Sequence, residues 1–273
     1  MNIMVTGGAG FVGTNLIKRL LKDGHNVVSL DNYSTGKEEN HQEGCEYVDA
    51  DIRDVIDFDY FMKDVDVVYH LAALARIQPS FKNPANTLEV GILGTMNILE
   101  WIKEKENKPR VVFAGSSSVH SGKFKNPYTF SKNVADDMCL MYKKHFGVDV
   151  SICRFYNVYG PHQLTEGDYC TVVGIFEKQY GFQRRDFTHV DDIVDGLILT
   201  SENETCWDEI ELGRGENQSI NELADMFNHE TKYIDERPGE ARETLCDTQI
   251  AERLIGYKPT RNIEDYIKEV IGE

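Results

Sequence analysis

The chain lacks any long hydrophobic run. None of its apolar stretches approaches the roughly 18 residues that a membrane-spanning helix needs. Its N-terminal residues also lack the basic region and apolar segment that mark a secretory signal. We therefore expect a soluble, cytoplasmic protein without a membrane partner.

Basic charge is scarce as well. Among 273 residues, 29 lysines and arginines stand against 46 aspartates and glutamates, which gives a formal net charge of −17. Because nucleic acids and anionic membranes both favour a basic surface, this balance argues against either as a partner. The six cysteines contain no C-x-x-C pair, so neither a metal site nor a disulfide framework is expected.

What the chain does have is an alternation of short apolar runs and amphipathic stretches. Runs rich in β-branched residues, which predict buried strands, lie at residues 3–5, 27–30, 65–71, 111–114 and 150–153. Helical periodicity occupies 12–22, 88–106 and 131–145, and then 190–200, 220–228 and 263–271. The alternation predicts an α/β protein with a doubly wound parallel sheet of the Rossmann type. We expect a dinucleotide-binding domain over 1–156 and a smaller C-terminal substrate-binding lobe over 157–273, with some interleaving of chain between them.

The first apolar run leads into a glycine-rich turn with the spacing Gly7-x-x-Gly10-x-x-Gly13. Glycines at these positions permit a tight turn, close approach of the backbone to a pyrophosphate, and close packing of a helix on a strand. Asp31 ends the next run 18 residues after Gly13. A carboxylate there can bind the 2′-hydroxyl of an adenosine ribose and repel a 2′-phosphate. The pattern predicts NAD rather than NADP, the alternative being a purely structural turn.

Tyr128 and Lys132 are four residues apart, and therefore share one face of a predicted helix. A lysine cation near a phenol lowers its pKa, which would make Tyr128 an acid and base. The run at 111–114 leads into three serines at 116–118, at the carboxyl end of the sheet where such folds bind ligands. The alternative is a surface tyrosine at a helix cap beside a polar turn.

With these two elements in place, the chain resembles the extended short-chain dehydrogenase/reductase family, in its nucleotide-sugar epimerase/dehydratase branch. The resemblance covers nearly the whole chain. The matching segments are TGGAGFVG at 6–13, DNYSTG at 31–36, HLAA at 70–73, GTMNIL at 94–99, YTFSK at 128–132, RFYNVYGP at 154–161, RDFTHVDD at 185–192 and RPGE at 237–240.

The resemblance implies a role for each matching residue. The NAD contacts would be Gly7, Gly10, Phe11, Val12 and Gly13 at the pyrophosphate, Asp31, Asn32, Tyr33, Ser34, Thr35 and Gly36 at the adenosine ribose, Asp51 and Ile52 at the adenine, and Leu71, Ala72, Ala73 and Ala75 along the cleft. Tyr128, Lys132 and Tyr156 would lie at the nicotinamide end, where Lys132 would hydrogen-bond the ribose.

On the substrate side, Asn157, Arg185 and Arg237 match positions that hold the nucleotide diphosphate of a sugar nucleotide. Arginine forks suit phosphate oxygens, although surface ion pairs with neighbouring acids such as Asp186 are the alternative. Ser116 would bind the sugar O4, with Ser117 as the alternative hydroxyl.

The chain departs from the family pattern at several positions. Gly91 stands where members usually carry an active-site asparagine, and His120 and Ser121 stand where they carry tyrosine and glycine. The segments from Ser116 to Tyr128 and from residue 174 to Arg185 are unusually short. We interpret His120 as a neutral loop histidine rather than an additional acid.

The leading hypothesis is an NAD-dependent nucleotide-sugar epimerase, acting at C4 of a UDP-hexose through a 4-keto intermediate. UDP-glucose, UDP-galactose and their N-acetyl forms are the first candidate substrates. A 4,6-dehydratase or decarboxylase of the same fold would need a carboxylate beside Ser116, where this chain has Ser117 and Ser118. A reductase using NADPH is disfavoured by Asp31, and a non-catalytic NAD-binding protein remains a further alternative.

By the same resemblance, the chain is expected to form a homodimer through the helices at 88–106 and 128–145. An apolar stripe on the second helix, made of Met138, Leu140, Met141 and Tyr142, fits either that interface or the core.

Overall fold

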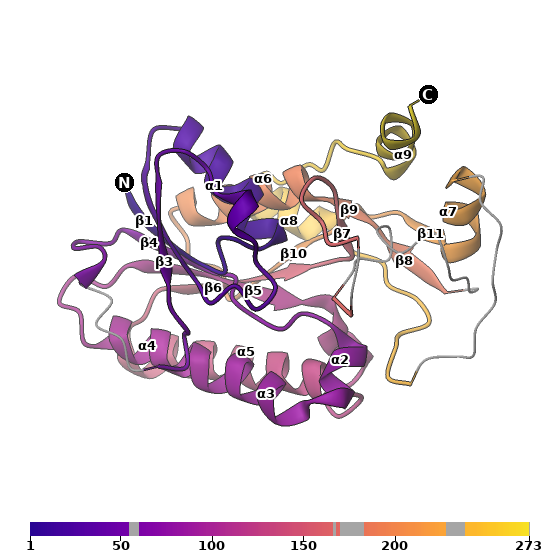
Figure 1. The fold of residues 1–273 in the computed structure, drawn as a ribbon. Coiled ribbons are helices and arrows are strands. Elements are labelled where there is room, and N and C mark those ends of the chain that lie inside the picture. The colour runs from indigo at the N-terminus through magenta and orange to yellow at the C-terminus, as the bar shows by residue number, and fades with distance from the viewer. Residues whose placement is uncertain (55–59, 166–167, 170–182, 228–237, 273) are drawn as a thin grey trace.

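The computed structural model describes residues 1–54, 60–165, 168–169, 183–227 and 238–272 (Figure 1). Within them, a seven-stranded sheet has the order β10-β6-β5-β4-β1-β2-β3, and every neighbouring pair is parallel. Its strands are β1 (Asn2–Thr6), β2 (Asn26–Asp31), β3 (Cys45–Asp49), β4 (Val67–His70), β5 (Arg110–Ser116), β6 (Val150–Phe155) and β10 (Glu209–Leu212). The predicted doubly wound α/β sheet is confirmed.

Helices cover both faces of this sheet, which is why its central strands read as continuous apolar runs. One face carries α1 (Phe11–Lys22), α6 (Val190–Glu202) and α8 (Thr248–Ile255), packed through side chains such as Leu16, Ile193 and Ile255. The other carries α2 (Ile77–Lys82), α3 (Pro84–Leu88), α4 (Thr95–Lys103) and α5 (Pro127–Phe146). On that side, residues such as Ile98 and Cys139 fill the core.

The helix predicted over 88–106 is present and runs without interruption to Lys103, but it is not α-helical throughout. α3 ends at Leu88, a π-helical segment spans Glu89–Gly94, and α4 follows. Two glycines in the π-helical segment permit close approaches that a side chain would prevent. A Cβ on Gly91 would lie 2.9 Å from Ser131 Oγ, and one on Gly94 would lie 2.4 Å from Ile52 Cδ1. The π-helical turn brings this segment against α5 and the end of the third strand.

Other elements also differ from the prediction. The helix expected at 131–145 begins at Pro127, because Asn126 caps it by accepting a hydrogen bond from the Thr129 amide at 2.7 Å. The strand expected at 65–71 is shorter, at Val67–His70. β3 and β10 were not among the predicted apolar runs, since each contains acidic residues.

Beyond residue 157 the chain contributes both to the main sheet with its helices and to a smaller lobe. β10 and α6 join the main sheet and its helical layer. A smaller lobe contains β7 (Val158–Tyr159) paired with β9 (Thr188–His189), and β8 (Arg184–Asp186) paired with β11 (Asn217–Ser219). With α7 (Ile220–Phe227) and α9 (Ile263–Ile271) it encloses a separate apolar cluster that includes Tyr159, Phe187 and Leu223. No helix in the described ranges is long and apolar enough to span a membrane.

The apolar stripe of α5 divides between the core and the surface. Tyr142 is buried and Met138 packs against the core, whereas Leu140 and Met141 are 39% and 44% exposed. Only the latter two are therefore available to a second copy of the chain.

Candidate active site

A cavity of about 440 Å³ opens at the carboxyl ends of the parallel strands and extends to the small lobe. It brings together most of the residues predicted from the sequence. Those that line it are Gly7, Gly10, Phe11, Val12, Gly13, Asp31, Asn32, Ser34, Thr35, Asp51, Ile52, Leu71, Ala72, Ala73, Ala75, Ser116, Ser117, Tyr128, Lys132, Tyr156, Asn157 and Arg185. Tyr33 and Gly36 do not line it, and Arg237 lies outside the described residues.

The glycine turn forms one end of the cavity by bringing backbone against backbone. Gly7 has a φ of 75°, and a Cβ on Gly13 would lie 2.3 Å from the Gly7 carbonyl oxygen. α1 begins at Phe11 without a side-chain cap, so the amide groups of its first turn are not engaged by one. A helix N-terminus presented this way suits a pyrophosphate, and the residues present fit a dinucleotide.

Asp31 is a buried carboxylate at the end of β2. Its two oxygens accept hydrogen bonds from the amides of Ala9 and Tyr33, each at 2.9 Å. Burial raises the pKa of Asp31, and these two hydrogen bonds oppose the rise. Gly36 lets the following loop close on this carboxylate, since a Cβ there would lie 2.9 Å from Asp31 Oδ1.

The Tyr33 side chain does not line the cavity, and its hydroxyl lies 3.0 Å from His41 Nε2. Of the pair expected at the adenine, Asp51 accepts from Asn32 at 2.8 Å and pairs with Arg53 at 2.6 Å. The hydrogen bonds from Arg53 hold the pKa of Asp51 well below its usual range. Ile52 is buried under Gly94.

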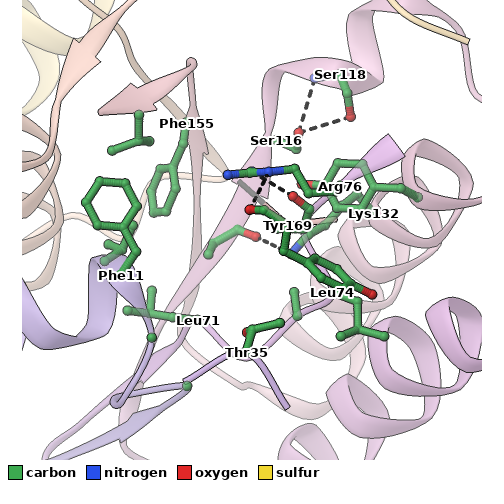
Figure 2. Close-up of a pocket in the computed structure, with 18 of the residues that line it drawn as sticks. Phe11, Thr35, Leu71, Leu74, Arg76, Ser116, Ser118, Lys132, Phe155 and Tyr169 are labelled. Atoms are coloured by element: carbon green, nitrogen blue, oxygen red, sulfur yellow. Dashed lines mark hydrogen bonds between the residues drawn. The ribbon is translucent and has the colours of Figure 1, made fainter. Parts of the chain in front are cut away.

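Tyr128, Lys132 and Ser116 all line the cavity, and Figure 2 shows Lys132 and Ser116 on the side away from Phe11. Lys132 donates to the Ala114 carbonyl at 2.7 Å, and its Nζ lies 4.8 Å from the Phe113 ring centre. Ser116 donates to Ser118 Oγ at 3.0 Å, and its own oxygen accepts from the Ser118 amide at 3.2 Å. A hydrogen bond between Ser116 and Tyr128 acts to lower the pKa of Tyr128, which links Ser116 directly to the phenol.

The expected lowering of the Tyr128 pKa by Lys132 is not observed. Burial raises the pKa of Tyr128 above its usual value, and outweighs the opposing effects of Ser116 and of the Arg76 cation. Burial also lowers the pKa of Lys132, to about 8. Desolvation dominates both groups because each charged form loses water without a neighbouring counter-charge strong enough to compensate. Tyr128 is therefore a neutral phenol at neutral pH in this arrangement.

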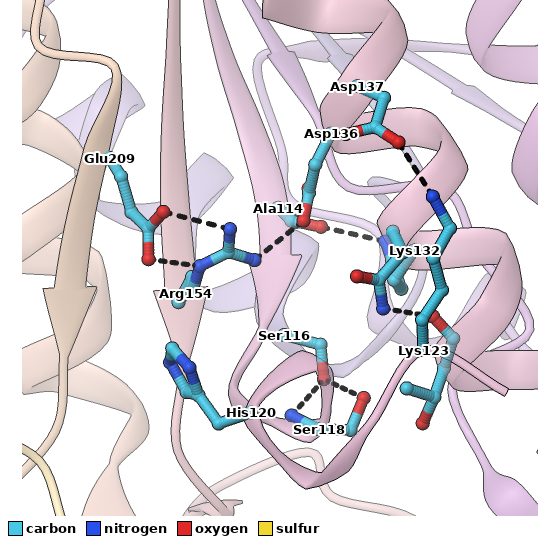
Figure 3. A network of polar contacts seen from close by, with 12 residues as sticks. Ala114, Ser116, Ser118, His120, Lys123, Lys132, Asp136, Asp137, Arg154 and Glu209 are labelled. Carbon is cyan, nitrogen blue, oxygen red and sulfur yellow. Dashed lines mark hydrogen bonds and ion pairs between the residues drawn. The ribbon is translucent and has the colours of Figure 1, made fainter. Parts of the chain in front are cut away.

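A network of charged side chains, in which Asp136 and Arg154 are buried, lies beside Lys132 (Figure 3). Asp136, one helical turn further along α5, pairs with Arg154 on β6 at 2.6 Å, and Arg154 also pairs with Glu209 on β10. The Asp136 carboxylate acts to raise the pKa of Lys132, against the effect of burial. The network thus keeps the negative charge of Asp136 near the ammonium group of Lys132.

Arg185 and Asn157 line the wall formed by the small lobe. The Arg185 side chain is 8% exposed, donates to Gln183 Oε1 at 2.8 Å, and lies 3.7 Å from the Glu240 carboxylate. Arg185 does not form the surface ion pair with Asp186 that was the alternative. The Asp186 carboxylate instead accepts hydrogen bonds from the backbone amides of Arg214, Gly215 and Cys246. Asn157 donates to Thr244 Oγ1 at 3.0 Å.

The structure also locates the residues at which the chain departs from the family pattern. Gly91 does not line the cavity, and a Cβ added there would lie 2.9 Å from Ser131 Oγ and 3.0 Å from Ser131 Cβ. His120 pairs with Glu211 at 2.5 Å outside the main cavity, and this pairing raises its pKa. His120 is therefore an exposed residue paired with a carboxylate, and this pairing acts against the neutral form that was expected. Much of the short segment before Arg185 lies outside the described residues.

The sequence analysis gave no role to five further residues that line the cavity: Arg76, Gln78, Tyr169, Gln183 and Glu240. Of these, Arg76 could have been found, because it follows the carboxyl end of β4 by six residues. Glu240 belongs to the matching segment RPGE, whereas Tyr169 and Gln183 carried no signal, since only the folded chain brings their segments to the sheet.

Three comparisons with known proteins bear on this site. A family model described as the NAD dependent epimerase/dehydratase family matches residues 3–211. The chain is 33% identical to a putative UDP-glucose 4-epimerase from Methanocaldococcus jannaschii, over 99% of this chain and 97% of that protein. It is 30% identical to UDP-glucuronic acid decarboxylase 1 from Xenopus tropicalis, over 98% and 71%. Its fold is similar to the crystal structure of UDP-glucose 4-epimerase with UDP-glucose from Thermotoga maritima, with a TM-score of 0.92, 26% identity, and coverage of 100% and 98%.

Proposed function

Because the chain belongs to the NAD-dependent epimerase/dehydratase family, we propose that it is a 4-epimerase of a nucleotide sugar. The observation that carries the proposal is the meeting of Tyr128, Ser116 and Lys132 in the same cavity as the glycine turn and Asp31. A hydroxyl acid/base and a dinucleotide cradle in one cavity are what a transient oxidation of a sugar carbon requires.

In this mechanism the phenolate form of Tyr128 removes the proton from the sugar 4-hydroxyl, and the phenol so formed later returns it. Ser116 donates to O4 and Lys132 supplies positive charge beneath Tyr128, so that charge developing on oxygen is stabilised by fixed groups. NAD, held by the glycine turn and Asp31, would supply the acceptor and donor of the hydride that leaves and returns to C4. Because burial keeps Tyr128 protonated at neutral pH, activity should increase with pH until Lys132 loses its proton.

The remaining predicted residues are proposed to hold the two nucleotides. The backbone of residues 10–13, Asp31 and Asn32 would bind NAD, with Asp51 and Ile52 beside its adenine. Asn157, Arg185 and Arg237 would hold the diphosphate of a UDP-sugar. Among the described residues, Arg185 supports this role best, because its guanidinium is buried beside the cavity and faces a single carboxylate at 3.7 Å.

Two other reactions of the family are less well supported. A dehydratase or decarboxylase needs an additional acid or base beside Ser116, and here Ser118 occupies that place and hydrogen-bonds Ser116. A reductase drawing on NADPH conflicts with the buried carboxylate of Asp31, which would repel a 2′-phosphate.

Proton NMR of the anomeric signals tests the proposal. The purified chain with NAD⁺ is incubated separately with UDP-glucose, UDP-galactose, their N-acetyl forms and UDP-glucuronate. Appearance of the C4 epimer from any of them establishes the reaction and ranks the sugars. A pentose or 4-keto-6-deoxy product would replace epimerisation by decarboxylation or dehydration, and no turnover with NAD bound would favour a non-catalytic NAD-binding protein.

A further inference from the structure

A buried histidine lies next to the cavity wall and takes no part in the proposed proton transfer. His70 is the last residue of β4, is 2% exposed, and does not line the cavity itself. Its Nδ1 lies 2.7 Å from Thr6 Oγ1, and its Nε2 lies 3.1 Å from Thr95 Oγ1. Both threonines are buried, so the two ring nitrogens connect the end of β1 to the start of α4.

The neighbouring hydrogen bonds determine which ring nitrogen carries the hydrogen. The Ala72 amide donates to Thr6 Oγ1 at 3.3 Å, and the Thr95 hydroxyl donates to the Gly91 carbonyl at 2.8 Å. Because the hydroxyl hydrogen of Thr95 is used on this carbonyl, its oxygen accepts from His70 Nε2, and Nδ1 accepts from the Thr6 hydroxyl. The opposite tautomer would leave the Thr6 hydroxyl hydrogen without an acceptor among the described residues.

The same surroundings keep the ring uncharged. Burial lowers the pKa of His70 to about 3, and the Lys132 cation acts in the same direction. The Phe113 ring lies close to both groups, with its centre 5.5 Å from that of the His70 ring and 4.8 Å from Lys132 Nζ. A protonated ring would therefore add a second buried cation near Lys132, and would also remove the acceptor of the Thr6 hydroxyl.

Thr6 connects the histidine to the backbone of the cavity wall. Ala72 lines the cavity, and its amide is the group that Thr6 Oγ1 holds, while the Leu71 amide donates to the Thr6 carbonyl at 3.1 Å. Ala72 also lies directly against the glycine turn, since a Cβ on Gly7 would lie 2.8 Å from the Ala72 nitrogen. A rotation of the Thr6 side chain would therefore release the wall beside the turn that is proposed to hold the pyrophosphate.

We propose that His70 is a positioning residue for the cofactor. As a neutral ring with its hydrogen on Nε2, it orients the Thr6 hydroxyl, which fixes the Ala72 backbone against the glycine turn. Thr95 orients the ring from the other side, where the π-helical segment passes into α4. The proposal rests on the binding of NAD at the glycine turn, as proposed above, but not on which reaction the enzyme catalyses.

The tautomer provides the first test. In ¹⁵N NMR of the full chain loaded with NAD⁺, His70 should show a protonated Nε2 and an unprotonated Nδ1, and its signals are identified by their absence from His70→Phe. The pattern should not change between about pH 7.5 and about pH 5.5, where an ordinary histidine titrates. A hydrogen on Nδ1, or titration of this ring within that range, would overturn the proposal.

Paired valine substitutions provide the second test. Thr95→Val removes the hydroxyl that accepts from the ring. The matched control is Thr200→Val, because Thr200 is as deeply buried and donates in the same way to the Gly196 carbonyl at 2.7 Å, but its other partner is the Cys153 thiol. Both variants should lose thermal stability to a similar extent, whereas only Thr95→Val should bind NAD⁺ about three- to tenfold more weakly in calorimetry. Thr95→Ser keeps the hydroxyl and should restore the affinity. Equal NAD⁺ affinities of the two valine variants would refute a positioning role.

Substitution of the histidine itself should have the larger effect. His70→Phe keeps an aromatic ring but loses both nitrogens, and should weaken NAD⁺ binding by about tenfold or more while leaving UDP binding within about threefold. Equal losses for NAD⁺ and UDP would indicate a general structural role and contradict the proposal. If His70→Phe does not fold, the Thr95 variants decide, and the His70 signals are then identified by their shift in Thr95→Val.

This role and the proposed reaction fail separately. NAD⁺ affinity that depends on His70 and Thr95, with no C4 epimer in the NMR assay of sugar nucleotides, would refute the epimerase and keep the role of His70. Epimerisation by a chain whose His70 and Thr95 variants bind NAD⁺ as tightly as the wild type would do the reverse.

Discussion

The two ends of the cavity are specified in different ways. At the end proposed for the cofactor, the cavity is lined by one continuous stretch, from the glycine turn into α1, together with the end of β2. At the sugar end the groups are side chains from separate segments: Arg76 after β4, Ser116 on β5, Tyr128 on α5, and Arg185 in the small lobe. The comparison shows why the first end follows a short sequence pattern, whereas the second depends on how distant elements pack.

The largest effect should come from removing the acid/base at the sugar end. Tyr128→Phe should reduce epimerisation by about 10²- to 10⁴-fold, because the proton transfer loses its side chain while the cofactor end is untouched. Turnover is followed by NMR and retained NAD by its absorbance after gel filtration. Unchanged turnover would contradict the proposed mechanism, and a change in ligand affinity alone would favour a non-catalytic protein.

A second prediction compares glycines at the two ends. A Cβ on Gly13 meets backbone atoms at 2.3 and 2.6 Å, while one on Gly91 meets the Ser131 side chain at 2.9 Å. A serine hydroxyl can rotate and backbone cannot, so Gly13→Ala should lower the free energy of unfolding by about 1–3 kcal/mol and Gly91→Ala by less. Thermal unfolding with and without NAD measures this. NAD should stabilise Gly91→Ala but not Gly13→Ala, and equal behaviour of the two would remove the contrast.

A third prediction concerns the charge beneath Lys132. Burial lowers the pKa of Lys132 to about 8 while Asp136 acts to raise it, so Asp136→Asn should move the loss of the lysine proton to lower pH. Because activity needs deprotonated Tyr128 and protonated Lys132, its increase with pH should level off at lower pH in this variant and reach a lower maximum, with little change at pH 6. Asp136→Glu should restore the profile. Asp137→Asn is the matched control, since Asp137 is exposed and pairs with Lys123; an identical shift there would refute the role of Asp136.

The smallest effect on the site should come from the outer face of α5. We predict a homodimer that uses Leu140 and Met141, which are exposed. Leu140→Glu should give a monomer in sedimentation velocity while changing the free energy of unfolding within about 0.5 kcal/mol. The control is Lys144→Glu, an exposed position on the same helix. A monomeric wild-type chain would show that this interface does not form.

Much of the fold could be read from the sequence, because buried parallel strands require apolar runs that helices must separate. The exceptions have physical causes. β3 and β10 are edge strands of the sheet and tolerate acidic residues, so they left no apolar run. The π-helical segment Glu89–Gly94 packs through close approaches of Gly91 and Gly94 to residues far along the chain, and periodicity does not contain that information.

For the site, the sequence by itself determined the glycine turn, the carboxylate of Asp31 and the spacing of Tyr128 and Lys132, because each is a local requirement of backbone geometry or helical periodicity. Only the tertiary structure decided their electrostatics and their neighbours. Burial reversed the expected effect on the pKa of Tyr128. Packing directed His120 toward Glu211, and brought Arg76 and Glu240 to a cavity that no local pattern connects. Desolvation and long-range packing are properties of the assembled chain, which is why they appear only once it is folded.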